Sequence, residues 1–182
     1  MVDPASEPFL FDTSAESWLA RSEQPTIRAW MRAYRLRYPV HISAVTVLER
    51  VKGYGLLWRR STAERRTLIE ASRVDYLSAL GKVWPLEAAA AVVAAEIMAM
   101  LPDPPTPAKK SHKLAESRQE RLVRWRFDIM IAATALVAPL SLIHNNAADF
   151  ETIRSAIEMS PRRFPGLGPL GLIRCSSLLH RV

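Results

Sequence analysis

Short apolar segments alternate along this chain with longer segments whose apolar residues recur at helical spacing, and this alternation constrains the fold most. Four short segments predict strands, at residues 8–12, 39–43, 82–85 and 140–143. Helices are predicted from Thr13 onward and over about 25–37, 45–53, 61–80, 86–101 and 126–138. Strands that alternate with helices favour a parallel sheet covered by helices on both faces. The sequence therefore predicts an α/β fold.

Prolines and glycines set the expected limits of several elements. Pro25 suits a first helical turn, and the helix from Val45 is expected to stop near Gly53 or Gly55. Four of the six residues from 102 to 107 are prolines, which exclude a continuous helix. We expect an exposed loop over 102–111, a separate basic helix over 112–124 and irregular structure after Ser160.

Length and composition are those of a globular protein. The 182 residues fit one domain, with a Pro-rich and basic insertion at 102–126 and a turn-rich tail at 160–182. Cys175 is the only cysteine, which excludes an internal disulfide. The apolar stretches 86–101 and 129–143 contain glutamates or a proline, so we expect buried helices rather than membrane spans. With acidic residues near the N-terminus and no signal-peptide pattern, a cytoplasmic location is expected.

Polar side chains stand where predicted strands end. Asp12 follows the first strand, and Asn145 and Asn146 follow the strand at 140–143. Ligands of open parallel sheets bind at the carboxyl ends of the strands. These side chains are therefore candidates for one site, although Asp12 is equally explained as a helix N-cap.

Two further acids lie on apolar helical faces. Glu49 lies among Val45, Leu48 and other apolar residues, and Asp128 shares its face with Ile131. A buried carboxylate is unfavourable unless a cation or a partner charge compensates it. Each acid also has a purely structural explanation: salt bridges to nearby arginines for Glu49, a helix cap for Asp128, and a turn or cap for Asp149.

Convergence of these acids would form a site of oxygen ligands. Mg²⁺ and Mn²⁺ prefer such ligands and bind phosphate groups at the same time, which suits phosphodiester hydrolysis. A haloacid-dehalogenase phosphatase is disfavoured, because its second aspartate would stand at Ser14. The sequence contains no glycine-rich phosphate loop, and its four histidines lack metal-ligand spacing.

The net charge of +7 is unevenly distributed. Seven basic residues fall between 109 and 126, namely Lys109, Lys110, Lys113, Arg118, Arg121, Arg124 and Arg126. A basic surface attracts polyanions, of which nucleic acid is the commonest. A solvated basic helix face explains the same segment equally well.

Four segments, in order, resemble the sequence blocks of PIN domains. They are Phe9-Leu-Phe-Asp-Thr-Ser14, Ile42-Ser-Ala-Val-Thr-Val-Leu-Glu-Arg-Val-Lys-Gly53, Phe127-Asp-Ile-Met-Ile-Ala-Ala-Thr-Ala-Leu136 and Leu142-Ile-His-Asn-Asn-Ala-Ala-Asp-Phe150. The third block is the most specific, and the set covers roughly residues 8 to 153. The chain thus resembles toxin ribonucleases of the VapC type.

This resemblance implies a three-layer α/β/α fold with a central parallel sheet of about four to five strands. It implies an endoribonuclease that uses Mg²⁺ or Mn²⁺, acts on RNA, forms homodimers and is neutralised by a cognate antitoxin. By motif match, Asp12 and Asp128 are the main metal ligands and Glu49 supports the metal or its water. Asn146 occupies the fourth acidic position, with Asp149 close by.

The sequence departs from the family pattern at Asn146, and at His144, where threonine is common. An asparagine at the fourth position lowers the negative charge of the pocket, which leaves open an alternative function. In that alternative, the chain is a catalytically weakened module that binds RNA or protein. We also predict that the basic insertion contacts the RNA backbone through Lys109, Lys110 and Lys113.

Overall fold

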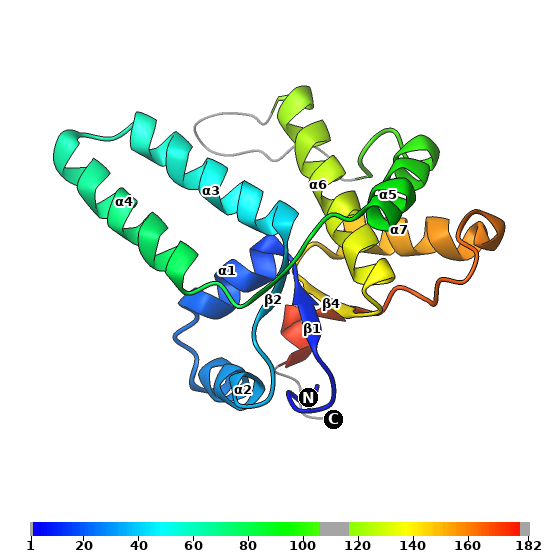
Figure 1. Ribbon diagram of the computed structural model, residues 1–182, viewed down its shortest axis with the longest axis horizontal. Helices are drawn as coiled ribbons and strands as arrows, with labels where there is room; N and C mark the ends of the chain where they lie inside the picture. The colour runs from blue at the N-terminus through cyan, green and yellow to red at the C-terminus, as the bar shows by residue number, and fades with distance from the viewer. Residues whose placement is uncertain (1, 106–116, 179–182) are drawn as a thin grey trace.

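A computed structural model describes residues 2–105 and 117–178 of the chain. Its centre is one parallel sheet of five strands in the order β3-β2-β1-β4-β5. The strands are β1 (Phe9–Phe11), β2 (His41–Ser43), β3 (Lys82–Trp84), β4 (Ser141–His144) and β5 (Leu172–Arg174). Helices cover both faces of the sheet (Figure 1), which confirms the predicted three-layer α/β/α fold.

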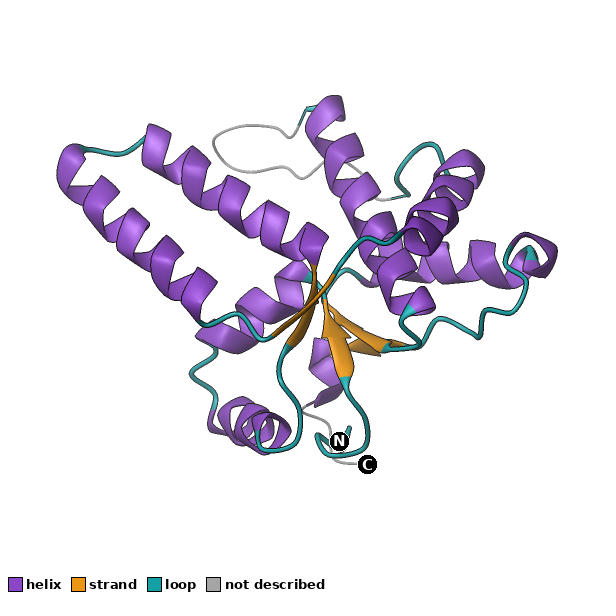
Figure 2. Cartoon of the chain, viewed as in Figure 1, coloured by secondary structure: helices purple, strands orange, loops and turns teal. Residues whose placement is uncertain are grey.

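Among the described residues, seven α-helices connect and cover the strands (Figure 2). They are α1 (Thr13–Arg21), α2 (Pro25–Arg35), α3 (Ala44–Arg59), α4 (Ala63–Ser78), α5 (Ala88–Met100), α6 (Arg118–Val137) and α7 (Ala147–Met159). The side chains of β1 alternate between two buried layers, as the period of a strand requires. Leu10 packs with α5, α6 and α7, whereas Phe9 and Phe11 pack with α1 and α2. Because both faces of β1 are buried, it lies at the centre of the molecule.

The helix from β2 is longer than predicted. The expected stop near Gly53 or Gly55 is wrong, because α3 continues to Arg59 and forms a hairpin with α4 that projects from the sheet (Figure 1). Glycine weakens a helix interior by only about 1 kcal/mol, which tertiary contacts offset. The Arg50 guanidinium lies 5.7 Å from the ring centroid of Tyr54 and 5.1 Å from that of Tyr76, which joins the two helices.

The separate basic helix predicted at 112–124 is also wrong in its described part. Residues from Arg118 onward belong to α6, which runs unbroken to Val137. A capping box starts this helix, since the Ser117 side chain accepts a hydrogen bond from the Glu120 backbone and the Glu120 side chain accepts one from the Ser117 backbone. Residues 106–116 of the predicted insertion, with Lys109, Lys110 and Lys113, lie outside the described residues.

The tail contains a strand that the turn-rich composition concealed. The expectation of irregular structure after Ser160 is wrong at β5, which pairs in parallel with β4. The backbone N–H of Leu142 donates to the carbonyl of Gly171 at 2.8 Å. A Cβ at Gly171 would lie 2.7 Å from the Ser141 hydroxyl oxygen and 3.2 Å from the Ser141 Cβ, so a larger residue there would require Ser141 to shift.

The two apolar stretches examined as membrane spans pack inside the fold. Ile97 of α5 and Ile129 of α6 are fully buried in the core beside Leu142 of β4. Within residues 2–105 and 117–178, the helices lack the length and continuous apolar character that a bilayer crossing needs.

Candidate active site

Asp12 lies at the carboxyl end of the central strand and begins α1. Its Oδ1 accepts a hydrogen bond from the backbone N–H of Ala15, so the predicted N-cap role is confirmed. The Ser14 hydroxyl donates to Oδ2 at 2.8 Å. The side chain is nevertheless buried, and burial, with a smaller effect of Glu49, raises the pKa of Asp12 to about 6. Asp12 therefore both caps the helix and faces other acids.

Asp128 projects from the middle of α6, so the alternative in which it caps a helix is wrong. It is 8% exposed. Burial raises the pKa of Asp128 well above its usual range, and the charges of Asp12, Asp149 and Glu49 raise it further. The cap explanation fails because no helix begins at Asp128 in the described structure, which leaves its burial among acids as the feature to explain.

Asn146 and Arg124 hold the carboxylates of this corner together. The Asn146 amide donates to Asp128 Oδ2 at 2.9 Å and also to Asp149 Oδ2. Arg124 Nη1 lies 3.2 Å from the same Asp149 oxygen. Asp149, in the first turn of α7, is fully buried. The amide of Asn146 therefore separates two buried acids that would otherwise repel each other.

Glu49 reaches the site from the opposite side, on α3. Glu49 accepts a hydrogen bond from the hydroxyl of Thr13, the residue that follows Asp12 in the chain. Its neighbour Arg50 is directed elsewhere, 3.4 Å from Glu16 Oε2 and 3.0 Å from the Ser17 hydroxyl. Arg50 therefore pairs with Glu16 and does not form the salt bridge to Glu49 that was the alternative explanation for this acid.

One cavity of about 540 Å³ joins these side chains at the carboxyl end of the sheet. It is lined by Asp12, Thr13, Ser14, Ser17, Arg21, Glu49, Arg124, Asp128, Asn145 and Asn146. Asp149 lies behind this lining and touches it through Asn146 and Arg124. Every site residue predicted from the sequence, apart from the lysines outside the described residues, thus lies in this cavity or against it.

The donor chemistry of the cavity fits a hard divalent cation. Asp12, Asp128 and Glu49 supply carboxylate oxygens, and burial, with added repulsion from Asp12 and other nearby acids, raises the pKa of Asp128. A cation between them would relieve that repulsion. In the part of the chain that the structure describes, no three Asp, Glu, His or Cys side chains already stand in the arrangement of a metal-binding group.

His144 does not line the cavity. It is fully buried at the end of β4, and its ring centroid lies 5.0 Å from that of Phe150. Neither ring nitrogen has a hydrogen-bond partner among the described residues. Burial, with the nearby charges of Arg174 and Arg154, lowers the pKa of His144 to about 4. The imidazole is therefore neutral at physiological pH and packs as an apolar ring.

A basic hollow adjoins the acid cavity and was not singled out in the sequence. It measures about 510 Å³ between α1 and α2, and Arg21 lines both hollows. Arg28, Arg32 and Arg35 of α2 complete its basic wall, and all three side chains are exposed. Their spacing of four and three residues places them on one helical face, which is the signal that sequence reasoning could have used.

The model of the PIN domain family matches residues 9–155. Among solved structures, the chain is similar to DNA-bound VapBC from Salmonella typhimurium, with a TM-score of 0.57 and 21% identity over 92% of this chain and 97% of that one. It is also similar to VapBC2 from Rickettsia felis bound to a promoter DNA fragment, with a TM-score of 0.58 and 14% identity over 92% and 98% of the two chains. A third similar structure, FitAcB from Neisseria gonorrhoeae, has a TM-score of 0.52 and 21% identity over 80% of this chain and 92% of that one. Comparison with curated proteins gave no match.

Proposed function

Because this chain belongs to the PIN domain family, we propose that it is a metal-dependent endoribonuclease and the toxin of a type II toxin–antitoxin pair. The observation that supports this proposal is the meeting of Asp12, Glu49 and Asp128 in one cavity at the carboxyl end of the sheet. Two of these acids are buried with raised pKa values, which favours a cation as their partner.

In this proposal the residues of the cavity have separate roles in phosphodiester hydrolysis. A bound Mg²⁺ or Mn²⁺ supplies activation of water and stabilisation of charge on the phosphate. Asp12 and Asp128 are its ligands in this proposal, with Glu49 as a ligand or as the group that orients the water. The Thr13 hydroxyl fixes Glu49, and the Asn146 amide fixes Asp128. In-line attack of water on phosphorus would break the P–O3′ bond, so that the strand carrying the leaving oxygen ends in a 3′-hydroxyl and the other in a 5′-phosphate.

The basic hollow beside the cavity supports a polyanionic substrate. Arg21 borders both hollows, so a strand whose phosphate lies at the acids can extend toward Arg28 and Arg32. Such contacts to the backbone add affinity without reading sequence. The backbone contacts proposed for Lys109, Lys110 and Lys113 concern the undescribed insertion and remain a prediction.

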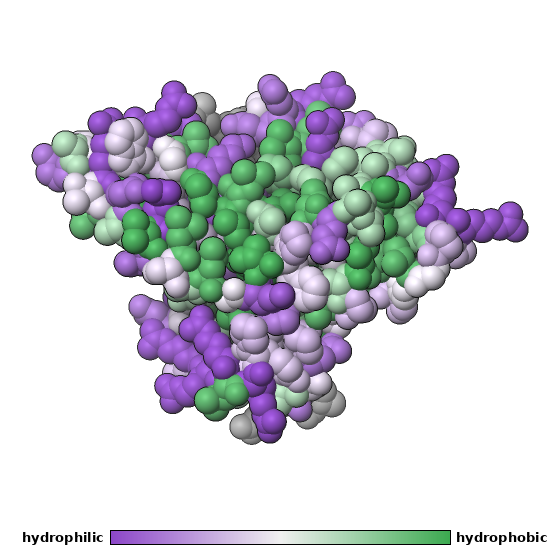
Figure 3. Space-filling model, in the orientation of Figure 1, coloured by the Kyte–Doolittle hydropathy of each residue, from purple (hydrophilic) through white to green (hydrophobic). Residues whose placement is uncertain are grey.

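A cognate antitoxin and a second copy of the chain are the proposed protein partners. The similar structures from Salmonella typhimurium and Rickettsia felis are VapBC complexes, which supports an antitoxin here. A band of apolar side chains crosses one face of the molecule, from the α3–α4 hairpin to α5 (Figure 3). The exposed large apolar side chains of α4, of α5 and of the segment before α5 include Val74, Leu77, Leu86 and Val92. A patch of this kind supports a homodimer. We place these assemblies in the cytoplasm.

The alternative function is a module that binds RNA or protein with a weakened catalytic site. Asn146 favours it, because an amide stands where the family has a fourth acid and it donates to Asp128. A donor to a carboxylate competes with a cation for the same oxygen lone pairs. This competition would weaken metal binding without preventing RNA from binding.

Cleavage of RNA by the purified full chain with Mg²⁺ or Mn²⁺ tests the proposal. Asp12→Asn, Asp128→Asn and an EDTA control accompany the native protein. We expect cleavage that is lost in both variants and in EDTA. A folded native chain that binds varied RNAs and cleaves none with either metal supports the alternative, and Asn146→Asp then tests whether the missing acid is the cause.

A further inference from the structure

A second groove opens beside the acid cavity, between α3 and the first half of α6. It measures about 700 Å³. Its walls are one face of each helix, because the lining residues recur at intervals of three and four. They are Glu49, Lys52, Gly53 and Leu56 on α3, and Glu120, Val123, Arg124 and Phe127 on α6, with Ser117 and Gln119 at the edge.

The groove adjoins the acid cavity. Glu49 and Arg124 line both hollows, so the groove begins where the proposed scissile phosphate lies. A group attached to that phosphate on one side enters the groove directly. A neighbour of the phosphate in the same molecule can therefore enter the groove, and for RNA this neighbour is a nucleoside.

The groove offers a flat ring, apolar walls and a cation. Phe127 immediately precedes Asp128 and is half-buried, and Lys52 Nζ lies 5.9 Å from the centroid of its ring. Leu56 and Val123 line the same groove. Nucleobases stack on aromatic rings whatever their identity. The Lys52 ammonium lies over the face of the Phe127 ring, so a base that stacks there takes the place of this cation, which can then pair with the phosphate of the same strand. The side chains of the groove therefore complement the base and the phosphate of a nucleotide.

Gly53 keeps this space open. Glycine is a poor helix former in the interior of a helix such as α3. A Cβ at Gly53 would meet nothing within 4 Å among the described residues, so packing does not demand glycine there. The absence of a side chain instead widens the groove, which Gly53 lines. Gly55 also has open space around a built Cβ, but it does not line the groove.

We propose that the groove between α3 and α6 is a subsite for the nucleobase adjacent to the scissile phosphodiester, with Phe127 as its stacking platform. The inference rests on the proposed ribonuclease function and specifies its substrate as single-stranded RNA. A base paired in a helix is stacked on its neighbours, whereas an unpaired base is free to lie on Phe127.

Gly53→Leu tests the proposal with Gly55→Leu as its matched control, because both exchanges add the same side chain to the same helix. Binding of a fluorescein-labelled single-stranded RNA 12-mer to the full chain is measured by anisotropy in EDTA. We expect Gly53→Leu to weaken binding about tenfold or more, as loss of one base–aromatic contact does. Gly55→Leu should bind like the native chain. Circular dichroism confirms that both variants fold.

Two further variants identify the stacking contact. Phe127→Leu keeps the apolar volume and removes the aromatic face, and Phe127→Tyr keeps that face. Affinity should fall in the first and be restored in the second. Equal affinities of Phe127→Leu and the native chain, or an equal loss in Gly53→Leu and Gly55→Leu, overturns the proposal. RNA affinity untouched by Gly53→Leu also overturns it and favours a peptide occupant.

Cleavage of an abasic ribose–phosphate 12-mer separates this inference from the proposed function. That diester chain has no nucleobase or other aromatic ring that could stack on Phe127, so it reports the acid cavity. In Gly53→Leu the KM for RNA should rise, so the rate of RNA cleavage should fall relative to that of diester cleavage. In Gly55→Leu this ratio should equal that of the native chain. An unchanged ratio overturns the subsite and leaves the nuclease standing. A native chain without metal-dependent cleavage of either substrate overturns the proposed function, and the subsite with it.

Discussion

Replacing Asp12 with asparagine should stabilise the folded chain at neutral pH while it abolishes nuclease activity. Burial raises the pKa of Asp12 from 3.8 to about 6. A raised carboxyl pKa contributes stability that is fully present below pH 3.8 and is lost as the pH rises through 6. Since one pKa unit corresponds to about 1.4 kcal/mol, ionised Asp12 destabilises the fold by about 3 kcal/mol at pH 7.5.

Asparagine removes this charge and keeps the helix cap. Its side-chain oxygen accepts the hydrogen bond from Ala15 as aspartate does, and the two residues are equivalent N-caps. A gain of about 3 kcal/mol corresponds to a rise in Tm of about 6 to 12 °C for a chain of this size. Asp12→Ala serves as the control, because it removes the charge and the cap together and should gain less.

Thermal and urea unfolding in EDTA measure the effect at pH 7.5 and at pH 3.5. The gain should be present at the higher pH and vanish at the lower, where the native Asp12 is protonated. Adding Mg²⁺ at pH 7.5 should narrow the difference in stability between Asp12→Asn and the native chain, because the ion binds and stabilises the native chain and not the variant. An Asp12→Asn chain that is less stable than the native one, or a gain that persists at pH 3.5, would refute the electrostatic reasoning.

Other perturbations have equally specific outcomes. The lowered pKa of His144 means that the native chain loses stability as the pH falls from 6.5 towards 4, by about 2 kcal/mol at pH 5; urea unfolding at pH 7 and pH 5 should show this loss reduced in His144→Leu. Asn146→Asp places a carboxylate against two others, so its Tm should fall in EDTA and rise more steeply than that of the native chain on titration with Mg²⁺; a variant as stable in EDTA as the native chain would contradict this. The double charge reversal Arg28→Glu and Arg32→Glu should weaken RNA binding and lower the slope of log affinity against log salt by one or more; a slope equal to the native one would place the RNA elsewhere.

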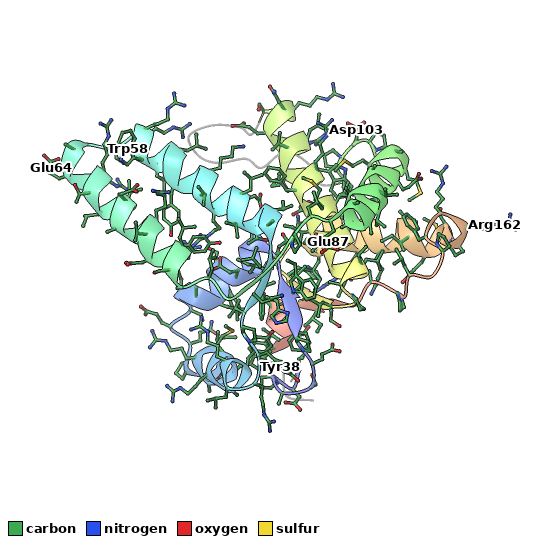
Figure 4. All side chains as sticks on the ribbon, viewed as in Figure 1. Tyr38, Trp58, Glu64, Glu87, Asp103 and Arg162 are labelled. Atoms are coloured by element: carbon green, nitrogen blue, oxygen red, sulfur yellow. The ribbon has the colours of Figure 1, made fainter. Side chains whose placement is uncertain are left out.

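The α3–α4 hairpin illustrates how far local pattern reaches. Trp58 and Glu64 lie near its outer end (Figure 4), beyond the two glycines at which the sequence predicted a stop. Every residue of α4 is exposed or half-buried. The Arg66 guanidinium lies 4.4 Å from the centroid of the Trp58 ring and supports the end of the hairpin. Contacts between two helices therefore overrode a local signal that, taken alone, favours a helix end.

The sequence by itself determined the α/β class, four of the five strands and the acids that meet in the cavity. It could do so because these features are local: an apolar run followed by Asp12, or Glu49 and Asp128 on apolar helical faces, is visible within one turn or strand. Parallel strands bring their carboxyl ends to one edge, which placed Asp12 and Asn146 together. Glu49 and Asp128 lie on helices, and the resemblance to PIN domains joined them to the same site.

Only the tertiary structure decided the features that depend on pairs distant in the chain. β5 exists because Gly171 lies against Ser141 and Leu142, thirty or so residues earlier. The Asn146 amide links Asp128 to Asp149, and Arg124 closes the same corner from α6. The basic hollow and the nucleobase groove each lie between two helices. Each hollow exists because two helices pack side by side, which the pattern of a single segment does not contain.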